Sequence, residues 1–477
     1  MPTRRDMLKI AAVGAAAAVL PLERIVSAAT AAEPVAAIPF AHPMPVPQSL
    51  TPSARLRTHD LYDVTMRETQ AEIVRGVLSP VRTYNGQFPG PTIRAKRGRP
   101  AVVRQTNALG VDTSVHLHGA KLPADQDGHP TDVIAPGGNR TYTYDNDQPA
   151  ASLWYHDHAH HQEATNVYAG LAGAYLLGDG QEAGLGLPSG QFDVPLQIRD
   201  ARVEQGGALV YTRASARPHM LVNGKERPYF AVSRNKYRLR VYNTSIDRYL
   251  KLRFADGRQF QQIGTDGGLL PAPLTATELA LSAGERADIV VDFATYAQGA
   301  SVVLQNTAAL ATENADVLRF DIARPQAPQL AHVPRRLADL PSMAPATVER
   351  SITLATDPVT SLYTINGLTY DPNRVDVSTP LGTTEIWTIT NADTAVPPPN
   401  FHVHHNFHTH LANFRVLSRN GGPPAPGETG VKDTVMVAPG DTVRITMTWA
   451  GHKGKFVYHC HQLPHAAEAQ MATIEIT

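Results

Sequence analysis

A pattern of turns and strands recurs three times along the 477-residue chain. Each copy places an Asn-Gly pair ahead of alternating apolar and polar residues, in "YNGQFPGPTIRAKRGRPAVVRQTN", "LVNGKERPYFAVSRNKYRLRVYN" and "TINGLTYDPNRVDVSTPLGTTEIWTITN". Such a pair, flanked by alternation, indicates a β-hairpin. A glycine turn that leads into a strand also recurs, in "IAPGGNRTYTY", "LSAGERADIVVDF" and "VAPGDTVRITM". The copies are about 140 residues apart, which suits whole domains rather than a solenoid.

The repeat therefore predicts an all-β chain of three tandem β-sandwich domains, at residues 45–180, 190–325 and 345–477. The 38 prolines and 35 glycines favour many short strands and turns, and helical periodicity is scarce. The stretches "GDGQEAGLGLPSGQ" and "IARPQAPQLAHVPRRLADLPSMAP" are the predicted linkers between these domains.

The N-terminal stretch "TRRDMLKIAAVGAAAAVL" has the features of a targeting segment. Two arginines, Arg4 and Arg5, precede a short apolar run, and "ATAAE" offers an A-x-A cleavage site. The run is too short to span a bilayer comfortably. We expect residues 1–32 to be a twin-arginine signal peptide that exports the folded protein to the periplasm or beyond, with an uncleaved membrane anchor as the alternative.

The 43 basic and 43 acidic residues balance, so the composition suggests neither a nucleic-acid partner nor stable insertion into a membrane. The single cysteine, Cys460, lies in "FVYHCHQLPH" and excludes an intrachain disulfide. In a β-strand, residues two apart share a face and lie about 7 Å apart. His459 and His461 are thus expected on one face and Cys460 on the other, where His465 can join it.

Histidines gather in the first and third predicted domains, whereas the second holds only His219. Four His-x-His pairs occur, in "HLHG", "WYHDHAHH", "HHNFHTH" and "HCHQLPH". Two imidazoles so spaced reach one metal, or two metals that lie close together. Two histidines and a cysteine with a weak axial ligand are typical of blue copper, while zinc has no redox chemistry that a thiolate bridge would serve. We expect a metal site shared by the two outer domains.

The motifs "YNGQFPGPTIRAKRG", "VHLHG", "LWYHDHA", "NVYAGLAGAYLL", "HLANFRVL" and "HCH" follow one another in this order. In this the chain resembles the multicopper oxidases, and most of all the three-domain bacterial branch with spore-coat laccases, bilirubin oxidases and phenoxazinone synthases. The resemblance covers nearly the whole mature chain. It implies cupredoxin-like Greek-key domains and four copper ions, one of type 1, one of type 2 and two of type 3.

The resemblance also implies the copper ligands, motif by motif. The type 2 copper takes His116 and His408. The type 3 pair takes six histidines, namely His118, His156, His158, His410, His459 and His461. The type 1 copper takes His405, Cys460 and His465.

The chain departs from the family pattern near the type 1 ligands. Asn406 replaces the usual proline, which we expect to alter the turn rather than remove a ligand. His402 and His404 offer a competing register, but without the family's full spacing. The axial position holds Gln470, whose carbonyl oxygen is a weak ligand that would lower the potential. Met471 is the alternative if the loop bulges by one residue.

A further departure concerns an acidic residue. Related enzymes place an acid directly after the last type 1 histidine, where it can help deliver protons. This chain has Ala466 there, with Glu468 two residues further on. Asp127 of "ADQDGHP" lies where related enzymes have an acid near dioxygen. We expect it to donate protons, with a structural role in the turn before Gly128 as the alternative.

The implied activity is the one-electron oxidation of phenols or aromatic amines, coupled to the four-electron reduction of dioxygen to water. Bilirubin, o-aminophenols, or cuprous and ferrous ions are alternative reductants. The nine methionines are spread along the chain, which argues against a cuprous oxidase. The non-enzymatic alternatives are a copper-free structural or cell-division homologue and a simple electron carrier. We expect a monomer whose partners are dioxygen and small aromatic reductants.

Overall fold

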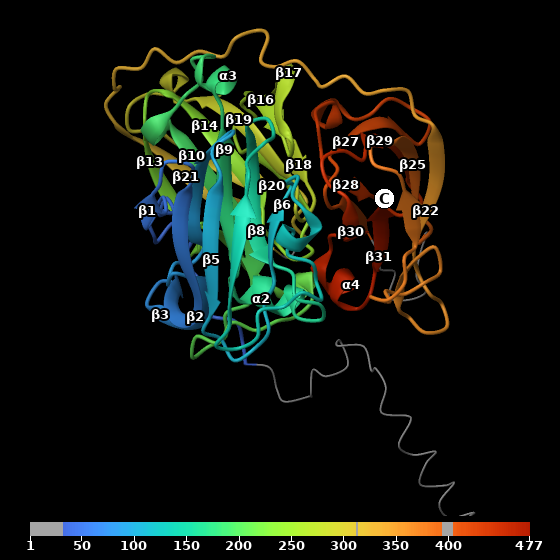
Figure 1. Cartoon of the computed structure of the whole chain (residues 1–477). Coiled ribbons are helices and arrows are strands. Elements are labelled where there is room, and N and C mark those ends of the chain that lie inside the picture. The colour runs from blue at the N-terminus through green and yellow to red at the C-terminus, as the bar shows by residue number, and fades with distance from the viewer. Residues whose placement is uncertain (1–31, 312, 394–403) are drawn as a thin grey trace, which may run out of the picture. The chain divides into compact units, whose positions relative to one another are not determined.

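The computed structural model describes residues 32–311, 313–393 and 404–477, and residues 34–477 form one compact unit. Strands dominate this unit, as the all-β prediction requires (Figure 1). The described α-helices are short, at α2 (Glu163–Ala169), α3 (Gly180–Ala183) and α4 (Leu463–Ala467). Within the described residues no helix has the length and apolar character needed to cross a membrane. The predicted signal peptide and His402 lie in the undescribed part, apart from residue 32.

Two sheets are built from residues 54–178. The first has the order β1-β2-β5-β7, with β3 also paired to β2, and its strands are β1 (Ala54–Arg55), β2 (Asp60–Val74), β3 (Val77–Tyr84), β5 (Ala101–Asn107) and β7 (Asn139–Tyr144). The second has the order β4-β9-β8-β6, from β4 (Gly90–Lys96), β9 (Ala172–Gly178), β8 (Ala151–Asp157) and β6 (Val115–His118). Both sheets contribute to one core, for example through Tyr62 and Val103 from the first and Leu153 and Tyr175 from the second.

Residues 193–324 form the next two sheets. One has the order β12-β11-β10-β14-β19-β16-β17, from β12 (Lys225–Glu226), β11 (His219–Val222), β10 (Asp193–Ala201), β14 (Lys236–Asn243), β19 (Arg286–Asp292), β16 (Phe260–Thr265) and β17 (Gly268–Ala276). The other has the order β13-β21-β20-β15-β18, from β13 (Tyr229–Ser233), β21 (Asp316–Arg324), β20 (Ser301–Asn306), β15 (Leu250–Phe254) and β18 (Leu279–Leu281). Leu196 and Ile289 of the first pack with Leu252 and Phe320 of the second.

Residues 348–476 repeat the arrangement. One sheet has the order β23-β22-β25-β29-β27, from β23 (Tyr363–Ile365), β22 (Val348–Thr356), β25 (Thr384–Asn391), β29 (Thr442–Thr448) and β27 (Phe414–Arg419). The other has the order β24-β31-β30-β26-β28, from β24 (Val377–Thr379), β31 (Met471–Ile476), β30 (Gly454–Cys460), β26 (His405–Thr409) and β28 (Thr434–Val437). Trp387 and Ile445 of the first share a core with Phe407 and Ile474 of the second.

The three Asn-Gly pairs form tight turns, as predicted. The asparagines Asn85, Asn223 and Asn366 have φ of 52°, 48° and 53°, and the glycines that follow also have positive φ. Positive φ at both central residues is the condition for a two-residue hairpin turn, and asparagine and glycine adopt it at least cost. The flanking residues pair across each turn, as Tyr84 with Gln87, Val222 with Lys225 and Ile365 with Leu368.

Burial along the strands shows which sheets are covered on both sides. In β5 buried and more exposed residues alternate, which is typical of a strand with one face in a core. Every residue of β8 is buried, because its outer face also packs against other parts of the chain. The sheet residues group into 54–178, 193–324 and 348–476. The finer domain limits 45–180, 190–325 and 345–477 remain a prediction.

Candidate metal centre

The four His-x-His pairs lie on or just beyond strands of two facing sheets. In the β4-β9-β8-β6 sheet His116 pairs directly with His156 across β6 and β8. In the β24-β31-β30-β26-β28 sheet His408 pairs directly with His459 across β26 and β30. Figure 1 shows β6 and β8 opposite β28 and β30, and His158 lies 4.9 Å from His459 between ring centroids. The period of two along each strand therefore directs all four pairs into one space.

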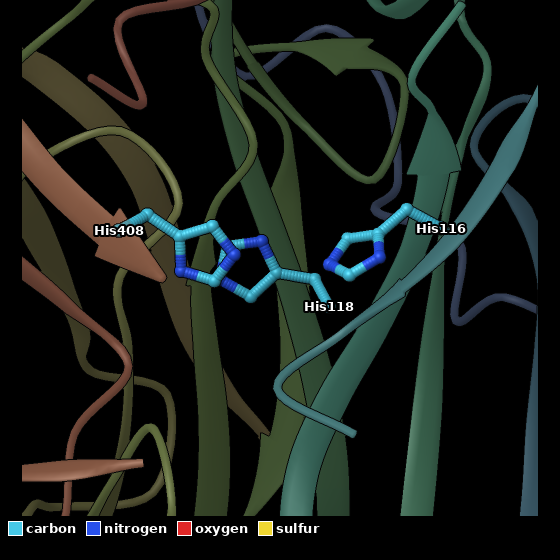
Figure 2. Close-up of side chains that lie close together, drawn as sticks. All are labelled: His116, His118 and His408. Atoms are coloured by element: carbon cyan, nitrogen blue, oxygen red, sulfur yellow. The ribbon is translucent and has the colours of Figure 1, made fainter. Parts of the chain in front are cut away.

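Eight imidazoles share this space. The ring of His118 stacks on that of His408, and the ring of His116 on that of His410, each with centroids 3.8 Å apart. Figure 2 shows His118 over His408, with His116 beside them. Three groups have ring nitrogens within 4.8 Å of one another: His116–His118–His408, His118–His156–His461 and His158–His410–His459. The structure thus brings together all eight histidines of the predicted cluster.

Protein oxygens orient most of these rings. Four rings donate to backbone carbonyl oxygens: His116 to Asp127 (2.7 Å), His156 to Asp157 (2.8 Å), His408 to Asp433 (2.7 Å) and His459 to Cys460 (3.0 Å). Two rings donate to carboxylates: His410 to Asp127 (2.6 Å) and His118 to Asp433 (2.9 Å). The opposite nitrogen has no hydrogen-bond partner among the described residues in five of these rings, namely His116, His118, His156, His408 and His410. Metal-ligating histidines are held in this way, so the donor set fits a metal.

Burial gives these imidazoles the protonation state that a metal requires. Burial, aided by neighbouring imidazoles, lowers the pKa well below the ordinary value in His118, His156, His158, His408, His410 and His461. It also lowers the pKa of His459 to about 4. These seven rings are therefore neutral near pH 7, and neutral imidazole is the form that binds metals.

A second, smaller cluster lies on the other face of β30. The Cys460 Sγ atom is 3.6 Å from His405 Nδ1 and 3.5 Å from His465 Nδ1, and the two nitrogens are 3.3 Å apart. All three side chains are buried. Two imidazole nitrogens and a thiol at mutual distances of this size fit a trigonal copper site.

Neighbouring groups hold the smaller cluster in place. His405 Nε2–H donates to Asp393 at 3.1 Å. Burial alone would lower the pKa of His405, but Asp393 and Cys460 outweigh it and raise that pKa to about 9 in the metal-free chain. The Asn406 N–H donates to the Cys460 sulfur at 3.4 Å. Asn406 lies inside strand β26, so the altered turn expected at this position is absent.

Strand register separates the two axial candidates. Met471 pairs with His459 in β31 and β30 and packs with Val457 and Tyr370, on the face away from the Cys460 sulfur. Gln470 is buried, and its Nε2–H donates to the Thr364 carbonyl at 3.1 Å. Its Oε1 atom has no hydrogen-bond partner within the described residues.

Asp127 contacts the larger cluster through two different atoms. Its carbonyl oxygen accepts from His116 and its carboxylate from His410. The next residue, Gly128, has φ of 74°, and a Cβ atom there would lie 2.2 Å from the Val115 carbonyl oxygen. Only glycine fits this close approach, so Gly128 fixes the loop that positions Asp127.

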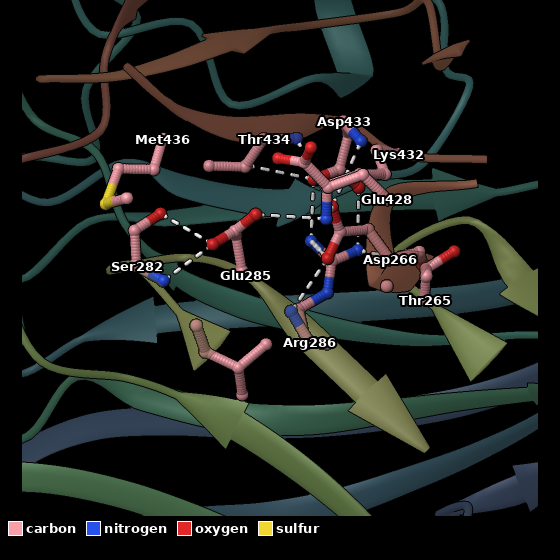
Figure 3. Close-up of polar contacts among 12 residues, drawn as sticks. Thr265, Asp266, Ser282, Glu285, Arg286, Glu428, Lys432, Asp433, Thr434 and Met436 are labelled. Carbon is pink, nitrogen blue, oxygen red and sulfur yellow. Dashed lines mark hydrogen bonds and ion pairs between the residues drawn. The ribbon is translucent and has the colours of Figure 1, made fainter. Parts of the chain in front are cut away.

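A buried ionic network links Asp266, Glu285 and Arg286 in the middle of the chain to Lys432 and Asp433 near its end (Figure 3). Arg286 binds both Asp433 carboxylate oxygens, at 2.6 and 2.7 Å, and donates to the Ser152 carbonyl at 3.0 Å. Lys432 bridges Asp266 at 2.9 Å and Glu285 at 3.0 Å. Asp433 in turn holds His118, so residues of the middle sheets support the site although none of their histidines reaches it.

Sequence reasoning did not find this network. Arg286 and Asp433 are 147 positions apart, and neither lies in a motif that points to the other. His219, the histidine of the middle region, instead donates to the Val35 carbonyl at 2.8 Å. Gly284 leaves room for the His461 ring, because a Cβ atom at this position would lie 2.7 Å from His461 Nδ1.

Comparisons with known proteins agree with this geometry. Residues 65–182, 200–319 and 334–477 match three family models described as multicopper oxidase, and residues 1–21 match a twin-arginine translocation signal. A laccase of Bacillus subtilis is 34% identical, over 92% of this chain and 98% of its own length. A bilirubin oxidase of Albifimbria verrucaria is 36% identical, over 83% and 72%. The cell division protein FtsP of Salmonella typhimurium is 32% identical, over 83% and 84%.

The crystal structure of a laccase from Pediococcus acidilactici superposes with a TM-score of 0.85 at 32% identity, over 92% of this chain and 95% of that one. The chain therefore belongs to the multicopper oxidase family and is a copper-dependent oxidoreductase. The predicted cupredoxin-like fold and the twin-arginine route of export are confirmed.

Proposed function

We propose that this chain is a laccase-like oxidase that couples the one-electron oxidation of phenols or aromatic amines to the four-electron reduction of dioxygen to water. One observation carries the proposal. Strand β30 directs the Cys460 sulfur into the smaller cluster, while His459 and His461 lie in the larger one. The carbonyl of Cys460 also accepts a hydrogen bond from His459 at 3.0 Å. A single strand thus connects the two clusters by a few covalent bonds.

The proposed ligands form four sets. The type 1 set is His405, Cys460 and His465, with Gln470 as axial ligand in preference to Met471. The type 2 set is His116 and His408. The two type 3 sets are His118, His156 and His461, and His158, His410 and His459. The groups of nitrogens within 4.8 Å of one another support these sets. Bound copper would supply one-electron redox chemistry and open positions for dioxygen.

The protein's own groups have three tasks in this proposal. The buried neutral imidazoles provide donors and exclude water from the larger cluster. Asp127, Asp433 and the backbone carbonyls fix the ring orientations. Asp127 also keeps one carboxylate oxygen, Oδ1, without a hydrogen-bond partner among the described residues. This oxygen lies 3.5 Å from His116 Nδ1, at the edge of the cluster, which supports the proposed role of Asp127 as a proton donor.

Oxygen uptake by the copper-loaded protein tests the substrate class. The panel is a phenol, an aromatic amine, bilirubin, Cu(I) and Fe(II), each at several concentrations. We expect the highest kcat/KM with the phenol or the aromatic amine. A clear preference for bilirubin or for a metal ion would replace the substrate class and leave the oxidase in place.

A copper-free structural role is the second candidate, because one relative is a cell division protein. The donor sets weigh against a copper-free role, since a residue able to bind copper stands at every proposed ligand position. Copper content separates the two. Four copper ions per chain with a blue absorption band favour the oxidase, while protein that binds no copper on reconstitution favours the structural role. Location in the periplasm or outside the cell, and a monomeric state, also remain proposals.

A further inference from the structure

Glu163 is a buried acid to which the proposed copper sites assign no role. It is the first residue of α2, and its side chain is fully buried. Neither carboxylate oxygen has a hydrogen-bond partner in the described part of the chain. An ionised carboxylate in such a place carries a large desolvation cost, so the group stays protonated.

Glu163 lies between two segments that carry proposed copper ligands. Helix α2 begins five residues after His158, and α4 contains His465. The two helices pack together, with Ala164 and Val167 of α2 against Leu463 and Ala467 of α4 (Figure 1). Glu163 therefore lies on the helix that faces α4, the element whose buried Ala466 replaces the acid of related enzymes.

The charges around Glu163 favour its neutral form. Burial is the largest cause that raises its pKa well above the ordinary value, and Asp157 adds to it, while backbone N–H groups at the start of α2 partly oppose this. Other titratable or charged groups on the elements packed against α2 are Arg82 and Tyr84 of β3, Tyr155, His156 and Asp157 of β8, and His465 of α4. Glu468 follows directly after α4, and Tyr370 lies close enough for Glu163 to raise its pKa. The Arg82 side chain donates to Asn166 and not to Glu163.

We propose that Glu163 relays protons to the dioxygen-reducing cluster, in place of the acid that related enzymes carry at the position of Ala466. This rests on the proposed function. Reduction of one dioxygen to two waters consumes four electrons from the organic reductant and four protons from solvent. Glu163 passes such a proton inward and is reprotonated from bulk water, so it is unchanged after each turnover.

The half-buried Glu468 is the rival for this role, since it also lies near the end of α4. The two acids differ in burial, because Glu163 is fully buried and Glu468 is only half-buried. This gives a matched pair of variants, Glu163→Gln and Glu468→Gln, which remove the same proton-carrying group at two neighbouring positions.

The first experiment measures oxygen consumption by the copper-loaded enzyme at saturating reductant across pH. We expect Glu163→Gln to lower the rate about 100-fold, the usual size of a lost proton donor. Glu468→Gln should stay within about twofold of the wild type, because its carboxylate carries no relayed proton. Copper content, the blue absorption and its anaerobic bleaching by reductant should not change in either variant. The double variant Glu163→Gln/Ala466→Glu should recover at least tenfold, because it returns an acid to the other helix.

A second readout does not need copper. Infrared spectra of the metal-free protein at pH 7 should show a neutral carboxyl band that is lost in Glu163→Gln and kept in Glu468→Gln. If Glu163→Gln does not fold, Glu163→Asp serves instead, and its band should shift rather than vanish. A wild-type turnover rate and pH profile in Glu163→Gln, or an unchanged band, would overturn the proposal. If the wild-type protein consumes no oxygen, the proposed function fails, whereas the infrared result still reports on Glu163.

Discussion

The two candidate metal clusters differ in how far apart their ligands lie in the sequence. The smaller one takes its three ligands from residues 405–465, on β26, β30 and α4 of the last part of the chain. The larger one combines histidines from residues 116–158 with others from residues 408–461. Pairing of β26 with β30, together with the short helix that follows β30, assembles the first, whereas the second forms only when two separate sheets pack against each other.

This difference explains where the buried charges lie. Arg286, Asp433, Asp266 and Lys432 join the middle of the chain to the larger cluster, at the place where separate regions must be held in register. In the smaller cluster, among the residues that the structure describes, the only ion pair with a ligand is that between His405 and the half-buried Asp393.

Replacing Cys460 with serine should abolish function through the smaller cluster alone. A serine hydroxyl does not replace a thiolate as a copper ligand, so we expect the blue absorption to vanish and substrate-driven oxygen uptake to fall to background. The eight imidazoles are untouched and should still bind their copper, as copper content and electron paramagnetic resonance would show. A variant that consumes oxygen at the native rate would contradict the proposed path between the clusters.

Replacing Arg286 with methionine should damage the larger cluster and spare the smaller one. The change leaves Asp433 buried without its cation, which costs about 3–5 kcal/mol in the free energy of unfolding. We expect denaturant unfolding to show this loss, and copper to leave the eight imidazoles while the blue absorption stays. Arg319→Met is the control, because its partly exposed pair with Asp321 contributes about 1 kcal/mol or less. Equal losses in both variants would argue against a special role for the network.

Replacing Gln470 with methionine should change only the potential of the smaller cluster. A thioether is a weaker axial donor to Cu(II) than an amide oxygen, so we expect the type 1 potential to rise while copper content stays constant. Redox titration of the blue absorption measures it. Met471→Leu is the matched control on the opposite face of β31, and a shift in that variant instead would favour Met471 as the ligand.

The smallest effect concerns the hydrogen bond to the Cys460 sulfur. Asn406→Pro removes the N–H donor, as in the usual family sequence, and we expect the type 1 potential to fall because the sulfur then donates more charge to copper. Asn406→Ala keeps the N–H and should leave the potential near that of the wild type. If alanine and proline shift it equally, the side chain of Asn406 matters rather than its backbone.

Much of this site was predictable because strands repeat every two residues. His-x-His spacing placed four pairs of imidazoles on common faces, and the same rule turned Cys460 away from its neighbours. The Asn-Gly turns were predictable from the positive φ that these residues tolerate. The Arg286–Asp433 pair was not, because no local pattern links residues 147 positions apart. Nor was the choice between Gln470 and Met471, which depends on the register of β31 against β30.

The order of the histidines along the chain has a consequence for biosynthesis. The first four are translated before residue 160, yet the imidazoles they face come from residues 408–461. The larger cluster therefore cannot be complete before residue 461 has been translated, and a product terminated before that residue lacks it. For a protein that is exported in the folded state, a complete larger cluster therefore shows that translation has passed residue 461.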